Sequence, residues 1–137
     1  MTTLTRSVGA AAALGVAAAH VPITGEHLHE APYIGVLFVL LEITCVVLAA
    51  ALVLRDDNVV WVATGAVTGA ALVAYLLSRT VGLPQIGDDV GNWTEPLGVV
   101  SVTIEAFLLL MSAGALLVFR RGRRSLGERT PGGLARG

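Results

Sequence analysis

The sequence contains no lysine and a single cysteine, Cys45, in 137 residues. One thiol excludes a disulfide, CxxC redox chemistry and a thiolate metal cluster within these residues. Charged residues make up 14% of the chain and aromatic residues 5%, whereas 55% of the residues are hydrophobic. The chain therefore lacks the alternation of polar and apolar stretches that a water-soluble domain of this length shows.

Motifs of the common enzyme chemistries are also missing. The sequence has no Ser/His/Asp arrangement, no phosphate-binding glycine loop and no HExxH pair. Its 16 glycines are explained by helix packing and turns. These absences favour a non-enzymatic protein, and they leave the question of an enzyme open.

Four apolar blocks of about 20 residues occupy most of the chain. We predict membrane spans at about 7–21, 32–54, 59–77 and 96–119. At 1.5 Å per residue, the last three are long enough to cross ~30 Å of hydrocarbon. The predicted fold is an all-α integral membrane four-helix bundle, with one transmembrane domain over residues 1–119.

The first block is the weakest of the four. It is short, rich in alanine and preceded by Arg6, which also fits the core of a secretory signal peptide. His20 followed by Pro22 is a poor cleavage site, because cleavage requires small residues. We therefore expect a retained helix, with the signal peptide as the alternative.

All nine basic residues are arginine, and most of them follow the fourth block. Because basic residues that flank spans stay in the cytoplasm, both termini are predicted to be cytoplasmic in a plasma-membrane protein. The tail, 120–137, is rich in glycine and arginine and is predicted to be disordered. It directly follows a span and lacks interleaved aromatic residues, which favours attraction to anionic lipid over nucleic-acid binding. Its arginines are Arg120, Arg121, Arg123, Arg124, Arg129 and Arg136.

The second and fourth spans share a pattern. Residues 30–42 read EAPYIGVLFVLLE and residues 95–105 read EPLGVVSVTIE. In each, an acidic residue precedes a proline, and a glutamate follows a glycine by seven residues (Gly35 to Glu42, Gly98 to Glu105). Proline suits the first turn of a helix because its missing N–H has no partner there. The pattern predicts two repeated hairpins that bring Glu42 and Glu105 to matching depth near the membrane centre.

Both glutamates are expected to face the inside of the bundle. A carboxylate in hydrocarbon costs at least ~2.5 kcal/mol, and Ser101 lies on the same helical stripe as Glu105. Arg79 ends the third span, with Tyr75 one turn before it, and it either pairs inward with one of the two acids or reaches the headgroups. A shared proton, Arg79 or a bound cation would balance the charge. Alternatively, both acids are protonated and hold the helices in register.

All three histidines lie near one end of the predicted first hairpin. His20, His27 and His29, with Glu26 and Glu30, form a candidate set of ligands for a divalent metal such as zinc or copper. A His-x-His pair is a weak signal, and a solvated loop is the plainer interpretation. Haem is disfavoured because it needs two histidines close together on helices.

The strings YLLSRTVGLPQIG, WTEPLGVVSVTIE and HLHEAPYIGVLFVLLE resemble small four-span membrane proteins of actinobacteria that carry an SRTxGLP signature. The resemblance covers about residues 15–115. It implies four spans and marks residues 78–84 as a motif, but it implies no activity.

We therefore predict a non-enzymatic membrane protein that binds or passes a cation, a proton or a small cationic ligand at a pair of glutamates. One alternative is an accessory subunit that docks a partner through its polar helix stripe. The other is a membrane metal or redox accessory protein. The expected partners are the lipid bilayer and a second copy or a larger membrane complex, without nucleic acid.

Overall fold

A computed structural model describes residues 1–128, which form four long helices and one short 3-10 turn. The helices are α1 (Thr3–Glu30), α2 (Pro32–Leu54), α3 (Asn58–Thr80) and α4 (Pro96–Glu128), and the turn is η1 (Gly87–Asp89). Each of the four helices is long and apolar enough to cross a membrane. The predicted all-α fold and four-helix bundle are therefore confirmed.

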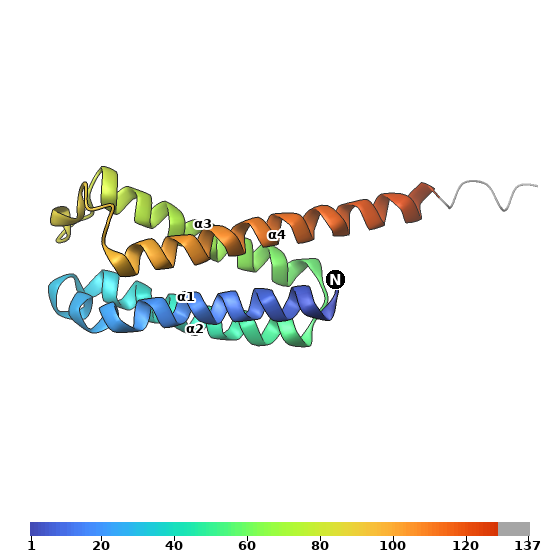
Figure 1. The fold of residues 1–137 in the computed structure, drawn as a ribbon, viewed down its shortest axis with the longest axis horizontal. Helices are drawn as coiled ribbons and strands as arrows, with labels where there is room; N and C mark the ends of the chain where they lie inside the picture. The colour runs from blue at the N-terminus through green and yellow to red at the C-terminus, as the bar shows by residue number, and fades with distance from the viewer. Residues whose placement is uncertain (129–137) are drawn as a thin grey trace, which may run out of the picture.

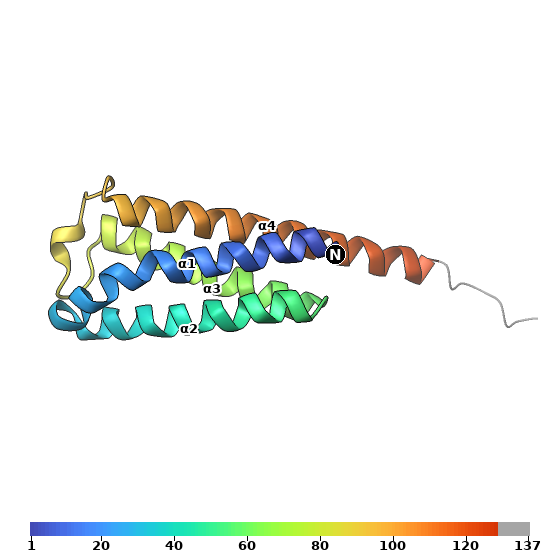
Figure 2. The same ribbon diagram turned by 60° about the horizontal axis from the view of Figure 1, so that its bottom comes forward.

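The four helices run alternately up and down (Figures 1 and 2). Helix α1 packs closely on α2 and on α4, and α3 packs on α4, whereas α2 and α3 meet least closely. The N-terminus and the α2–α3 link lie at one end of the bundle, here called the terminal end. Ala31 and segment 81–95 connect the helices at the other end, called the loop end. Both views show α3 diverging from α2 toward the loop end.

Two predicted boundaries differ from the structure. The first span was expected to end at residue 21, before a loop, but α1 continues to Glu30 with Pro22 inside it. A proline removes one backbone hydrogen bond, which transmembrane helices tolerate. At the other end of the chain, α4 continues to Glu128, so the expected disordered tail is wrong for residues 120–128. The rest of that tail, 129–137, lies outside the described residues.

Polar caps fasten the terminal end. The Arg6 side chain crosses from α1 to α2, where Nε donates to the Leu52 carbonyl at 2.9 Å and Nη2 donates to the Val53 carbonyl. Those carbonyls belong to the last turn of α2, where no further N–H of the helix is available to bond to them. The Asp57 carboxylate accepts from the Val60 N–H at 3.0 Å and caps the start of α3.

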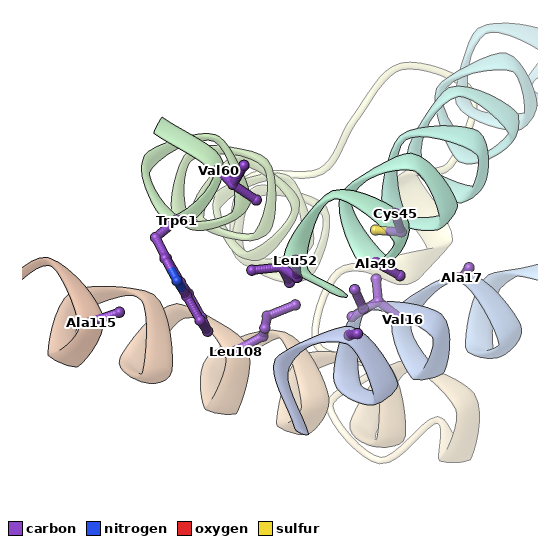
Figure 3. Packing of buried hydrophobic residues seen from close by; sticks show 11 residues of the cluster. Val16, Ala17, Cys45, Ala49, Leu52, Val60, Trp61, Leu108 and Ala115 are labelled. Atoms are coloured by element: carbon purple, nitrogen blue, oxygen red, sulfur yellow. The ribbon is translucent and has the colours of Figure 1, made fainter. Parts of the chain in front are cut away.

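The largest buried side chain is Trp61, at the terminal end of α3. Figure 3 shows its ring directed toward Leu108 of α4, with Leu52 of α2 and Val16 of α1 in the same cluster. Gly9 makes room for the ring, because a Cβ there would lie 2.9 Å from Trp61 Cη2. All four helices therefore contribute apolar side chains to a packed core in this half.

Candidate functional site

A cavity of about 580 Å³ lies between the two hairpins at the loop end. All four helices and segment 81–95 line it. Its polar lining includes six carboxylates, one guanidinium and two imidazoles. They are Glu26, Glu30, Asp88, Asp89, Glu95, Glu105, Arg79, His20 and His27. Such an excess of carboxylates favours cations in the cavity over anions.

Glu105 is the lining residue of α4 that lies furthest from the loop end. Its side chain is almost completely buried, with 1% of the residue exposed. Ser101, one turn earlier, donates its hydroxyl to Glu105 Oε1 at 3.0 Å. His20 of α1 places Nε2 at 3.8 Å from the same oxygen. Both partners, Ser101 and His20, are predicted site residues, and both line the cavity.

The His20–Glu105 contact requires a proton. His20 Nδ1 lies 2.9 Å from the Val16 carbonyl, which only accepts, so Nδ1 carries a hydrogen. Nε2 therefore faces Glu105, and without a further proton a lone pair would face a carboxylate oxygen. The contact becomes favourable when either group holds that proton. The contact therefore places an imidazole nitrogen beside the buried carboxylate at the deep end of the cavity, at a distance longer than a hydrogen bond.

Glu42 occupies different surroundings. It is partly exposed, it does not line the cavity, and it accepts a hydrogen bond of 2.6 Å from the Thr24 hydroxyl of α1. Thr24 lies one turn beyond His20 on α1. Helix α1 therefore contacts Glu105 through His20 and Glu42 through Thr24. The expected facing pair of glutamates is therefore not formed, because α1 lies between their helices. Sequence analysis did not identify Thr24.

Arg79 pairs with the loop rather than with either glutamate. Its Nη1 lies 2.5 Å from Asp89 Oδ1, and its Nη2 lies 3.9 Å from Glu95 Oε2. The guanidinium carbon lies 5.0 Å from the centre of the Tyr75 ring. Arg79 is buried, with 7% of the residue exposed, so it does not reach toward headgroups. Both expectations for Arg79 are corrected, because its acidic partners come from segment 81–95.

The predicted metal ligands are not gathered. Glu26, His27 and Glu30 line the cavity, whereas His29 is exposed and does not. Across the described part of the chain, no three histidine, cysteine, aspartate or glutamate side chains are placed to hold a metal ion. Residues two apart on an α-helix point about 200° apart, so His27 and His29 diverge. The prediction assumed a loop where α1 continues.

Aromatic packing fixes the two cavity histidines. The Phe38 ring of α2 lies edge-on to His20 and to His27, with centroid distances of 4.9 and 5.0 Å. His27 Nδ1 also donates to the Ile23 carbonyl at 2.9 Å. His20, two helical turns earlier, bonds in the same way to the carbonyl four residues before it. Phe38 therefore separates a deep imidazole from a shallow one.

No protein-family model, no curated protein and no solved structure matches this chain. The roles of the cavity residues therefore rest on their own geometry and charge. The resemblance of residues 78–84 to an actinobacterial signature stays an expectation.

Proposed function

We propose that this protein is a non-enzymatic multi-pass membrane protein that binds or passes a cation, a proton or a small cationic ligand. The cavity at the loop end would hold the cation, and Glu105 would be its counter-charge. The observation that carries the proposal is a buried carboxylate at the deep end of a cavity whose lining holds six carboxylates and one arginine.

The energetics favour this role for Glu105. An ionised carboxylate inside a membrane needs an opposite charge or a proton, because hydrocarbon does not solvate it. Arg79 is held by Asp89, so the groups near Glu105 are His20 and the Ser101 hydroxyl. A cation in the cavity would supply the missing charge, and it would compete with the proton of the His20–Glu105 pair. The cavity volume lies within the range of ligand sites, roughly 300–1,000 Å³.

The orientation is part of the proposal. The arginines from Arg120 onward, at the end of α4 and beyond it, favour a cytoplasmic terminal end in the plasma membrane, so the loop end and the cavity mouth would face outward. Glu26, Glu30 and Asp88 are exposed at that end and would attract cations from solution. Passage across the membrane would need a second copy or a larger complex, since apolar side chains of all four helices close the terminal half.

Equilibrium binding of radiolabelled tetramethylammonium to the purified protein in detergent tests the proposal. We expect Glu105→Gln, which keeps the side-chain volume, to weaken binding by about tenfold or more. Glu42→Gln is the matched control, because it makes the same change outside the cavity. Equal binding by wild type and Glu105→Gln would refute the proposal, and so would equal losses in both variants. Thermal unfolding of each variant checks that it is folded.

The surroundings of Glu42 support a second candidate function. This carboxylate is partly exposed on an apolar helix and has Thr24 as its hydrogen-bond donor, so a partner helix would cover a costly polar group. The protein would then be an accessory subunit that docks through this position. In that case Glu42→Gln changes the size of the complex isolated in mild detergent, whereas Glu105→Gln leaves that size unchanged.

A further inference from the structure

The cavity is open sideways, between α2 and α3, as well as at the loop end. Leu37 and Leu40 of α2 line it while each is 54% exposed. Ala70 and Ala74 of α3 also line it and are exposed. These four residues form the side opening. They belong to the two neighbouring helices that pack least closely and that diverge toward the loop end (Figure 1).

The side opening reaches hydrocarbon depth. Leu40 lies eight residues from the start of α2 at Pro32, and Ala70 lies ten residues from the end of α3 at Thr80. At 1.5 Å per residue these separations are about 12 and 15 Å from the loop end. Half of a ~30 Å hydrocarbon layer is about 15 Å, so the opening faces acyl chains rather than water.

The walls behind the side opening are apolar. On α3 they consist mainly of Val67, Ala70, Ala71 and Ala74, and on α2 Phe38 and Leu41 stand opposite. Alanine side chains leave space, and none of these residues carries a charge. A compact hydrated ion gains nothing from such walls, whereas a ligand with apolar surface loses contact with water and with lipid headgroups by entering.

The carboxylate at the deep end of the cavity suits a ligand with a single positive charge. Glu105 is the only carboxylate that the described residues place beside His20, and no three metal-ligating side chains converge in the same described region. The acids nearer the mouth either pair with Arg79 or lie exposed to solvent. One buried carboxylate balances one positive charge, not two.

From these four observations we infer that the ligand is a lipophilic monovalent organic cation, which enters from the bilayer through the side opening between α2 and α3. The inference rests on the proposed function, because it takes Glu105 as the counter-charge. It adds the class of ligand and the route. The apolar part of the ligand lies against Phe38 and the alanines of α3, and the charged centre approaches Glu105.

Binding of three probes to the full-length protein in lipid nanodiscs tests the inference. The probes are tetraphenylphosphonium, which is lipophilic and cationic, tetramethylammonium, which is compact and cationic, and triphenylphosphine oxide, which is lipophilic and neutral. We expect tetraphenylphosphonium to bind at least about tenfold more tightly than either of the other two. Binding to empty nanodiscs is subtracted for each probe.

Two variants separate the route from the charge. Ala70→Leu/Ala74→Leu fills the side opening with two larger side chains at exposed positions, where the fold tolerates them. We expect it to weaken tetraphenylphosphonium binding, or slow its association, by about tenfold and to leave tetramethylammonium binding unchanged. Ala113→Leu, at an exposed position of α4 away from the cavity, is the matched control and should change neither. Glu105→Gln should weaken both cations, and Glu105→Asp should recover part of the loss.

The outcomes distinguish the two levels of the proposal. Weakening of both cations by Glu105→Gln, with no effect of the double leucine variant, would overturn the lateral route and leave the proposed function standing. Equal binding of triphenylphosphine oxide and tetraphenylphosphonium would overturn the cationic class and identify a site for neutral lipophiles. Unchanged binding of both cations in Glu105→Gln would overturn the proposed function itself, and the inference with it.

Discussion

The terminal half and the loop half of the bundle differ in how α3 fills the space beside its neighbours. At the terminal end, α3 presents Trp61, whose ring is buried against α1 and α4. Toward the loop end it presents Ala70, Ala71 and Ala74, and a cavity remains there. A large side chain on α3 therefore fills the packed end, whereas small side chains and the divergence of α3 from α2 accompany the open end.

The same comparison separates the two glutamates. Glu105 of α4 faces the open half and lines the cavity, whereas Glu42 of α2 faces α1 and bonds to Thr24. Each glutamate follows a glycine by seven residues, after a proline that starts the helix, but the neighbours of the two glutamates differ. A shared local pattern therefore indicates a shared helix start, and it does not by itself indicate a shared role.

The largest effect is expected from Trp61→Ala, which would open the packed half. Removing a fully buried aromatic side chain typically destabilises a protein by about 3–5 kcal/mol, because the neighbours cannot fill the space. Thermal and denaturant unfolding in detergent measure the loss. Trp93→Ala is the control, because Trp93 is 46% exposed on the loop segment, and it should cost far less. Equal losses would contradict the contrast between the two halves.

A smaller effect is expected from Gly35→Ala, where α1 and α2 approach most tightly. A Cβ at this position would lie 2.6 Å from the Leu28 backbone nitrogen, so one helix has to move. Overpacking of this kind costs about 1–3 kcal/mol. Gly25→Ala is the matched control, since a Cβ there meets nothing within 4 Å. Unfolding temperatures that shift equally in the two variants would contradict the close approach.

Sequence reasoning predicted the fold because the length and apolarity of the four blocks carry most of that information. It ended the first span at residue 21, where the first apolar block stops, just before Pro22. In α1 the missing hydrogen bond is tolerated and the helix continues to Glu30. Because of that error, His27 and His29 were expected in a loop that could bind a metal, whereas both lie on a helix.

The candidate site was predicted in part. Glu105 and Ser101 were identified from helical spacing and burial cost, and they lie together. His20 was expected in a metal site with the other histidines, and the structure instead places it beside Glu105. The pairing of Arg79 with Asp89 and Glu95 was missed, because it depends on how segment 81–95 folds back. Positive φ angles at Gly82 and Gly91 shape that segment, and the sequence showed only that glycines were present.

Arg79→Gln should loosen the loop end while leaving the packed half unchanged. It removes the ion pair with Asp89. The contribution of this pair to stability is about 1–2 kcal/mol, between that of an exposed ion pair and that of a charge-assisted hydrogen bond. Hydrogen exchange of segment 81–95 should therefore become about tenfold faster. Asp88→Asn is the control, because Arg79 pairs with Asp89 and Glu95 and not with Asp88. Faster exchange around Trp61 would show that the two halves are coupled.

The smallest effect is expected from Tyr33→Phe, which tests how the first hairpin holds the loop segment. The Tyr33 hydroxyl donates to the Pro84 carbonyl at 2.6 Å, and the residue is 38% exposed. A single hydrogen bond contributes about 0.5–1.5 kcal/mol, and partial exposure places this one near the lower figure. Hydrogen exchange should accelerate about two- to threefold in segment 81–95 only, with the middle of α4 as the internal reference. An equal acceleration in α4 would mean that Tyr33 stabilises the whole bundle, and the loop end would then not be an independent region.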